Sequence, residues 1–251
     1  MSEVISHKMK LIQLLNNCRG SIILDYGCGK GDFINLLLTT PDSPKAIVAA
    51  DADPDMIASI MKRFTNEIQH GIVIPKIVSS PADLLEYKFD KIICHNVLEC
   101  VDDKLPFINI FKLLLNNDDT LILSHHDFDT AIYNSSFKEL TRNLVHHFAD
   151  TQQAWQKYSD GQMGRKIPGL MAHSDFRDSV KCETWRVIDT EFKSGNYGFL
   201  MADMLMEVGK GTFSDADMDA WHQDLINKSN QGEYYFAIDL IVAICVAKSS
   251  S

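Results

Sequence analysis

The stretch that decides the fold reads IILDYGCGKGDF and occupies residues 22–33. A short apolar run ends in Asp25, glycines follow at Gly27, Gly29 and Gly31, and an apolar helical pattern then begins. This order is typical of a buried parallel strand that turns tightly into a helix and lets a ligand approach bare backbone. We therefore expect a ligand-binding turn at the three glycines.

The spacing of these glycines indicates which ligand the turn accepts. A dinucleotide fingerprint reads G-x-G-x-x-G, because backbone amides and a helix N-terminus must hold a pyrophosphate. Here the spacing is G-x-G-x-G, and Asp32 stands where the third glycine would be. The Asp25 carboxylate would repel a pyrophosphate but suits an ammonium and a sulfonium group, as in S-adenosylmethionine. The candidate cofactor contacts of this stretch are Asp25, Tyr26, Gly27, Gly29 and Gly31.

The same stretch resembles the first motif of the class I S-adenosylmethionine-dependent methyltransferases, which reads roughly D-x-G-x-G-x-G after a strand. Further motifs follow in the family's order between about residues 20 and 130, and only the strand pattern matches beyond them. The resemblance implies an α/β, Rossmann-like doubly wound sheet of seven strands, with an antiparallel last strand and a helical cap after the fifth. It also implies a methyltransferase that uses S-adenosyl-L-methionine.

A second apolar run, residues 46–50, ends in Asp51, about 20 positions after Gly31. At this distance a Rossmann-type strand offers a carboxylate to the ribose hydroxyls of its ligand. We therefore predict that Asp51 and the adjacent Ala52 contact the cofactor. The alternative for Asp51 is a solvated loop carboxylate.

A third apolar run, residues 72–78, precedes the sequence SSPADL, which in the resembled family approaches the adenine ring. The family's usual acidic position aligns with Ser80, and Pro81 has no amide proton to donate. The resemblance therefore leaves Ala82 and Asp83 as candidates for the adenine edge.

The segment FDKIICHNVLECV, residues 89–101, resembles the family's fourth strand and the turn beneath the methionine part of the cofactor. The resemblance implies that backbone near Cys94 and His95 meets that part. For the His95 side chain, a packed polar residue at a strand end is the alternative to a contact with the cofactor or in the active site.

The fifth apolar run, residues 120–124, leads into the most polar titratable cluster of the chain, His125, His126 and Asp127. Ligands of open α/β sheets bind outside the carboxyl ends of the strands, and in the resembled family this position commonly faces the methyl acceptor. A His-Asp pair could orient or deprotonate a nucleophile, so these three residues are the candidate catalytic group. A metal site and a plain polar loop are the alternatives, and we assign no metal.

Between about residues 130 and 180 the regular alternation of strands and helices stops, and we interpret this segment as a helical cap over the acceptor site. Such lids exclude water and supply acceptor specificity. For Arg165, a surface ion pair is an equal alternative to a contact with a substrate carboxylate. The candidate acceptor contacts are Asp129, Tyr133, Trp155, Arg165 and Tyr197.

The 251 residues are predicted to form a single methyltransferase domain. Its parts are a cofactor-binding core over 20–130, the cap over about 130–180, and C-terminal strands and helices over 181–251. With 24 basic and 34 acidic residues, the net charge of −10 disfavours a nucleic-acid partner. The sequence shows no signal peptide and no apolar stretch near ~18 residues, so we expect a cytoplasmic monomer or homodimer without membrane contact.

We expect methyl transfer to N, O or C of a small-molecule acceptor, in small-molecule metabolism. In such a transfer most of the rate comes from placing nucleophile, methyl carbon and sulfur in line, and a base is needed only if the acceptor arrives protonated. One alternative is a peptide or protein acceptor on an open cleft. Another is a non-catalytic methyltransferase-like binding module, which would have no physical need for Asp25, the three glycines and Asp51.

Overall fold

The computed structural model of the protein describes residues 6–152, 156 and 158–248. Its strands form one seven-stranded sheet of an α/β fold. The strand order is β3-β2-β1-β4-β5-β7-β6, with β7 antiparallel to both neighbours and the pairs among β1 to β5 parallel. This confirms the predicted Rossmann-like fold. In chain order the elements are α1 (His7–Leu14), β1 (Ile22–Tyr26), α2 (Asp32–Thr39), β2 (Ala46–Asp51), α3 (Pro54–Arg63), α4 (Thr65–Gln69), β3 (Val73–Ile77), η1 (Pro81–Leu84), β4 (Phe89–His95), η2 (Leu98–Cys100), α5 (Lys104–Leu114), β5 (Leu115–Tyr133), α6 (Lys138–Asp150), α7 (Met163–His173), β6 (Val180–Asp189), α8 (Tyr197–Gly209), α9 (Asp215–Asn230) and β7 (Phe236–Val246).

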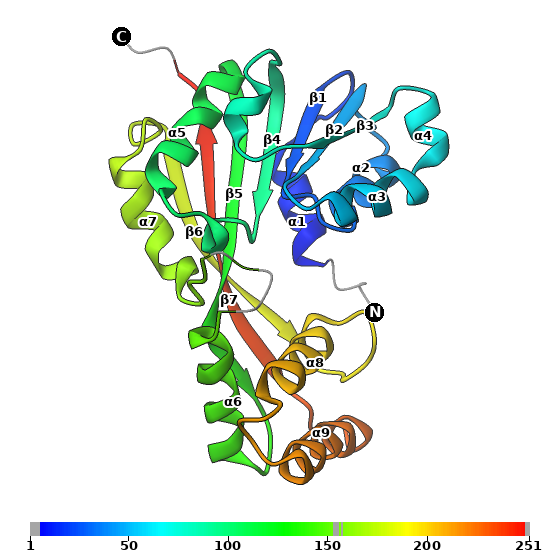
Figure 1. The fold of residues 1–251 in the computed structure, drawn as a ribbon, viewed down its shortest axis with the longest axis vertical. Helices are drawn as coiled ribbons and strands as arrows, with labels where there is room; N and C mark the ends of the chain where they lie inside the picture. The colour runs from blue at the N-terminus through cyan, green and yellow to red at the C-terminus, as the bar shows by residue number, and fades with distance from the viewer. Residues whose placement is uncertain (1–5, 153–155, 157, 249–251) are drawn as a thin grey trace.

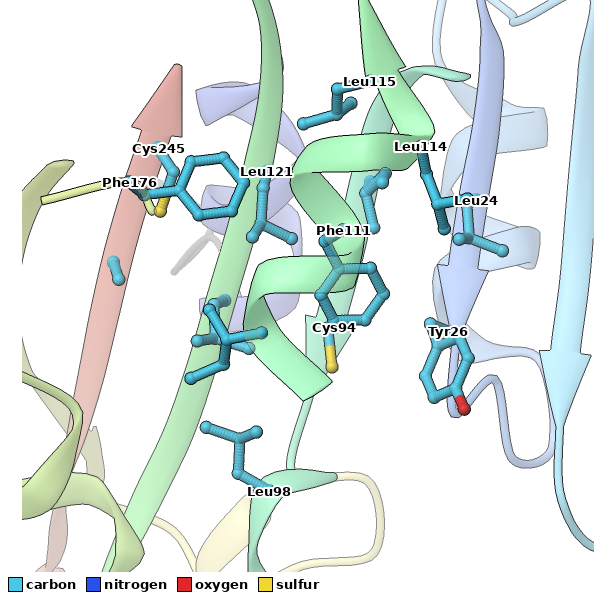
Figure 2. Close-up of a cluster of buried hydrophobic side chains, with 14 of the residues drawn as sticks. Leu24, Tyr26, Cys94, Leu98, Phe111, Leu114, Leu115, Leu121, Phe176 and Cys245 are labelled. Carbon is cyan, nitrogen blue, oxygen red and sulfur yellow. The ribbon is translucent and has the colours of Figure 1, made fainter. Parts of the chain in front are cut away.

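Two apolar layers cover the two faces of the sheet, because successive strand residues point to opposite sides. Leu24 of β1 packs with Phe111 of α5 in the first layer, which also includes α7 residues. Figure 2 shows this cluster between the sheet and α5. Ile23, the neighbour of Leu24 in β1, belongs to the second layer, with Leu11 of α1 and residues of α2 and α3. We call these the α5/α7 face and the α1 face.

Strands β5, β7 and β6 extend beyond the rest of the sheet and carry α6, α8 and α9 at their far end (Figure 1). A third apolar cluster joins these elements, with Leu144 of α6, Leu205 of α8 and Trp221 of α9 all buried. We call the three helices and the far halves of the three strands the second lobe. Helix α7, by contrast, packs on β5, β7 and α5, so it lies outside the second lobe although the predicted cap included it. The domain boundaries at 130 and 180 stay a prediction.

The fifth strand is longer than the sequence suggested. We expected it to end at Ser124 and to lead into a polar loop, but β5 continues to Tyr133. The reason is its antiparallel partner: β7 pairs His126 with Leu240 and Tyr133 with Phe236, with one irregularity between them. Backbone pairing with a long apolar strand thus overrides the polar character of the segment. Within the described ranges, no helix has the length and apolar character needed to cross a membrane.

Candidate active site

The glycine loop joins β1 to α2, and its three glycines all have positive φ angles, 72° at Gly27, 49° at Gly29 and 82° at Gly31. The amide of Gly27 donates to the carbonyl of Ala50 at 2.8 Å. A Cβ atom at Gly27 would lie 2.2 Å from Cγ2 of Val97, whereas one at Gly29 would meet no atom within 4 Å. The protein itself therefore requires glycine at 27, and Gly29 leaves bare backbone open to a ligand.

Asp51 ties the glycine loop to the end of β2. Its Oδ2 accepts a hydrogen bond from the Gly29 amide at 2.8 Å, and its Oδ1 accepts one from the Asp53 amide at 3.0 Å. Each carboxylate oxygen keeps a further lone pair, so both can still accept ribose hydroxyls. Ala52 follows in an exposed position. The predicted ribose contact fits this geometry and stays a prediction.

Asp25 lies at the carboxyl end of β1 on the α1 face and is 1% exposed. Its Oδ2 is buried and has no hydrogen-bond partner among the described residues, and burial raises the pKa of its carboxyl to about 7. Nearby Lys8 of α1 pairs with Asp32 of α2, with Nζ and Oδ2 2.5 Å apart. A buried carboxyl oxygen without a partner is what a ligand ammonium would satisfy, so the site fits the amino acid part of S-adenosylmethionine.

Tyr26, also predicted to bind the cofactor, points the other way. Its ring packs edge-to-face against Phe107 and Phe111, at centroid distances of 5.4 Å, in the cluster of Figure 2. The alternation of strand residues places it on the α5/α7 face, opposite Asp25. The side chain of Tyr26 is therefore a core residue, and only its backbone remains available to a ligand.

The two candidates for the adenine edge form a cap on the short 3₁₀ helix η1. Oδ2 of Asp83 accepts hydrogen bonds from the amides of Ser79 and Ser80, at 2.7 and 3.0 Å. The amide of Ala82 donates to Oγ of Ser80 at 3.2 Å. This is a capping box, whose S-x-x-D spacing is visible in the sequence. The contact of Ala82 and Asp83 with adenine stays a prediction.

Three histidine rings meet on the α1 face, near the carboxyl ends of the central strands. The ring of His7, from α1, lies 6.0 Å from that of His95 and 5.1 Å from that of His126, measured between centroids. His95 and His126 are 5.3 Å apart, and Nδ1 of His95 lies 2.9 Å from Oγ of Ser124. Burial lowers the pKa of His7 to about 4 and the pKa values of His95 and His126 well below 6.5. All three rings are therefore neutral near pH 7.

Tyr197 of α8 joins this histidine cluster from the second lobe. Its ring stacks on His126, with centroids 4.3 Å apart and planes inclined by 14°, and its hydroxyl lies 3.2 Å from Nδ1 of His126. The Nε2 atoms of His126 and His7 are buried without a hydrogen-bond partner in the described part of the chain. Buried polar atoms without partners are costly in a protein interior, so they mark a place for a ligand.

The three residues of the predicted catalytic group, His125, His126 and Asp127, do not lie on the same face of the sheet. His126 lies on the α1 face, whereas His125 and Asp127 point to the α5/α7 face, because β5 continues through all three. Nδ1 of His125 donates to the carbonyl of His126 at 2.7 Å, and burial lowers its pKa to about 4. Of the three residues, only His126 lies in the histidine cluster.

Asp127 is engaged in an ion pair with α7. Its carboxylate accepts from Nε and Nη2 of Arg165, both at 2.6 Å, and from the Arg165 amide at 2.9 Å. Nη2 of Arg165 also lies 3.1 Å from Oδ2 of Asp129. The structure thus corrects the predicted catalytic role of Asp127 and gives Arg165 and Asp129 partners within the protein. For Arg165 an ion pair within the protein fits this geometry, but its partner Asp127 is buried and not at the surface.

Tyr133, another predicted acceptor contact, belongs to the core of the second lobe. Its hydroxyl donates to the carbonyl of Gly198 at 3.0 Å, and its ring packs on Phe236 at 4.8 Å. We correct its role to a structural one. Trp155 lies outside the described residues.

Sequence reasoning missed three residues of this site, His7, Ser124 and Asn96. Asn96 follows β4 with a φ angle of 54°. Its side-chain oxygen Oδ1 accepts a hydrogen bond from the backbone amide of His126. No sequence pattern set His7 apart, because α1 also carries Lys8, Lys10 and Gln13. Among the described residues, no group of three or more histidine, cysteine or acidic side chains is arranged to hold a metal ion.

Comparison with known proteins places this geometry in a family. Residues 18–196 match the family model described as a methyltransferase domain. A stretch of 108 residues is 31% identical to the ribosomal protein L11 methyltransferase of Nitrosococcus oceani, and covers 43% of this chain and 34% of that protein. The matched stretch thus spans about a third of that relative's length.

Solved structures of low sequence identity share the fold. The YcgJ protein from Bacillus subtilis superposes with a TM-score of 0.57 at 14% identity, over 97% of this chain and 99% of that one. A SAM-dependent methyltransferase from Thiobacillus denitrificans, solved with S-adenosyl-L-homocysteine, gives 0.53 at 13% identity, over 96% and 92%. The family match covers more than half of the chain. The chain therefore belongs to the methyltransferase-domain family and is an S-adenosylmethionine-dependent enzyme.

Proposed function

We propose that the methyl acceptor is a small molecule that binds at the histidine cluster. The observation that carries this proposal is the pair of buried Nε2 atoms on His7 and His126, which have no hydrogen-bond partner in the described ranges. Helix α1 covers this place from the core and Tyr197 closes it from the second lobe. Both nitrogens are buried, whereas a folded macromolecule would need these atoms at the surface.

The bound cofactor supplies a methyl group on a sulfonium sulfur, and this chain positions the two reactants. We assign Asp25 to the ammonium group, Asp51 to the ribose and His126 to the acceptor. Their lowered pKa values make the three clustered histidines weak bases, which favours positioning over proton removal, so the rate would come from alignment. The attacked atom is N, O or C. We further propose a monomer or homodimer in the cytoplasm, without a nucleic-acid or membrane partner.

A protein or peptide acceptor is the second candidate. Its support is the relative named a ribosomal protein L11 methyltransferase, which shares 31% identity over 108 residues. The match covers 43% of this chain, and a methyltransferase core is shared by enzymes with different acceptors. The burial of the unpaired histidine nitrogens favours the small molecule over this alternative.

The two candidates differ in where a labelled methyl group ends. We would incubate the protein with methyl-labelled S-adenosylmethionine and either the small-molecule fraction or the desalted protein fraction of a cell extract. We expect label in new small molecules and none in protein. Label confined to a protein band would favour the second candidate instead. In the Gly29→Ala variant, which is expected to bind the cofactor more weakly, enzymatic labelling should fall while background methylation stays the same.

Cofactor binding is expected to strengthen as the pH rises toward 7, through Asp25. The pKa of this carboxyl is about 7 in the free protein, and its charged neighbours are Lys8, Asp32 and Asp51. A ligand ammonium stabilises the ionised carboxylate, so binding releases a proton wherever Asp25 is protonated. The affinity for S-adenosylhomocysteine should therefore rise by up to about tenfold per pH unit below pH 7 and level off above it.

Calorimetric titration of S-adenosylhomocysteine between about pH 5.5 and 8.5 measures this dependence. The matched variant is Asp25→Asn, which keeps the shape of the side chain but cannot ionise. It should bind more weakly, with an affinity that no longer changes through pH 7. A wild-type affinity that is flat over this range would show that Asp25 does not face the ammonium group.

A further inference from the structure

Asn96 sits in the turn after β4 and is held there by the neighbouring strand. Its backbone amide donates to the carbonyl of Ser124 at 2.9 Å, and its φ angle of 54° lies in the left-handed region that asparagine tolerates. The side chain of Asn96 faces His126, which lies two residues after Ser124 in β5. Asn96 is therefore a fixed part of the wall around the His126 ring.

The contacts of Asn96 determine whether its side-chain nitrogen, a donor, or its side-chain oxygen, an acceptor, faces the imidazole of His126. The amide of His126 needs an acceptor and finds Oδ1 of Asn96 at 2.9 Å, which orients the side-chain amide group. Nδ2 of Asn96, which can only donate, then lies 3.0 Å from Nδ1 of His126, closer than Oδ1 at 3.2 Å. A protonated Nδ1 would set two donors against each other, so Nδ1 of His126 accepts.

Tyr197 completes the same arrangement. Its hydroxyl lies 3.2 Å from Nδ1 of His126, and burial holds the pKa of this phenol well above its usual value, so the hydroxyl keeps its proton near pH 7. The stacking of the two rings places this hydroxyl off the plane of the imidazole, in which the single lone pair of Nδ1 lies. That lone pair accepts from Nδ2 of Asn96, and the single proton of the neutral ring resides on Nε2.

Nε2 of His126 is the atom left to serve a ligand, since it is buried without a partner in the described part of the chain. Because it already carries the proton, Nε2 can donate a hydrogen bond but has no lone pair with which to remove a proton, and the ring could become an imidazolium only at Nδ1. Burial opposes that charge, and so do His7, His95, His125 and Lys8 around the ring. His126 is therefore a donor in the histidine cluster.

We propose that Asn96 is a positioning residue that holds His126 as a hydrogen-bond donor at Nε2, and that the methyl acceptor presents an oxygen lone pair to that donor. A hydrogen bond to the attacked atom would tie up the lone pair that must bond to the methyl carbon. The contacted oxygen is therefore a non-reacting one, of a carboxylate, phosphate or carbonyl group beside the attacked atom. This inference rests on the proposed function, because it places the acceptor at the histidine cluster.

The tautomer is measured directly by nitrogen-15 NMR of histidine-labelled protein bound to S-adenosylhomocysteine, with His126→Gln used to assign the signals. We expect one protonated nitrogen, Nε2, and one unprotonated nitrogen, Nδ1, from about pH 6 to 8. A proton on Nδ1, or titration near pH 6.5, would overturn the proposal. This measurement needs no acceptor, so it decides the role of Asn96 even if the proposed small-molecule activity fails. A large change in the NMR chemical shift of the Nε2 proton when S-adenosylhomocysteine alone binds would assign His126 to the cofactor instead.

The positioning role is isolated by Asn96→Asp, which keeps an oxygen for the His126 amide and replaces the donor at Nδ1 by an acceptor. We expect the His126 proton to move to Nδ1 and the pKa of its imidazole to rise, so that it titrates in the NMR experiment. Asn16→Asp is the matched control, because Asn16 is exposed and has nearly the same backbone angle, φ 56°. An unchanged tautomer in Asn96→Asp would rule out the assigned role.

Kinetics with the acceptor recovered in the labelling assay separate a donor from a base. His126→Gln keeps an N–H near the position of Nε2, whereas His126→Phe keeps the stacked ring without a donor. We expect Gln to retain kcat/KM within about tenfold and Phe to lose roughly 10- to 100-fold, with the pH profile unchanged in both. Equal losses with an altered pH profile would mean that His126 is a base. Mass spectrometry of the methylated product identifies the oxygen group, and an acceptor that lacks one contradicts the proposal.

Discussion

Gly27→Ala is expected to lower the free energy of unfolding by about 2–5 kcal/mol. Two effects add at this position. The φ angle of 72° lies in the left-handed region, where a Cβ atom is strained, and that atom would stand 2.2 Å from Cγ2 of Val97. Val97 cannot easily retreat, because it follows Asn96 in the turn that Ser124 anchors. Chemical denaturation of wild type and variant measures the loss.

Gly29→Ala is the matched variant, with the same strain but no clash. Its φ angle is 49°, and a Cβ atom there meets no protein atom within 4 Å. We expect a stability loss of only about 1–2 kcal/mol, with S-adenosylhomocysteine binding weakened roughly 5- to 150-fold because the new methyl group occupies the ligand's approach. Equal stability losses in the two variants would contradict the packing role of Gly27. Unchanged binding by Gly29→Ala would move the cofactor away from this backbone.

The sequence was informative about the cofactor half because there the chemistry acts through the backbone. Glycines that need positive φ angles and a carboxylate that ends a strand leave a spaced pattern in one short segment, as at Gly27 and Asp51. One assignment within this half was reversed, since Tyr26 faces the core. Strand alternation predicts that outcome once Asp25 is placed toward the ligand, because neighbouring residues cannot share a face.

The acceptor half was harder to foresee because its residues come together only in three dimensions. His7, His126 and Tyr197 belong to α1, β5 and α8, and no spacing in the sequence connects them. The polar run at His125 was expected to follow the end of the fifth strand, and its three residues were predicted to act together as a catalytic group. Its pairing with β7 sends them to opposite faces, and that pairing depends on a strand more than a hundred residues away. Asn96 lay in the predicted turn after the fourth strand, but nothing in that pattern connected it with His126.

Arg165→Met is expected to destabilise the protein by about 1.5–3 kcal/mol. The Asp127 side chain is 1% exposed and accepts two side-chain hydrogen bonds from Arg165, so the change leaves a buried carboxylate without its cation. The guanidinium is 44% exposed, and solvent screening keeps the cost below that of a fully buried pair. The approach of α7 is close here, since a Cβ atom at Gly164 would lie 2.8 Å from Asp127.

Two further variants decide between this structural role and the substrate contact that the sequence allowed. Lys166→Met, one residue along α7, removes an ion pair with Asp160 whose lysine is half exposed, and it should cost less than about 1 kcal/mol. The double variant Asp127→Leu/Arg165→Met removes both charges and should recover most of the stability, because no buried carboxylate remains. If Arg165→Met were as mild as Lys166→Met and instead raised the KM for the acceptor, Arg165 would hold the substrate. A large loss of stability that the double variant restores, with KM unchanged, assigns Arg165 to joining α7 to β5.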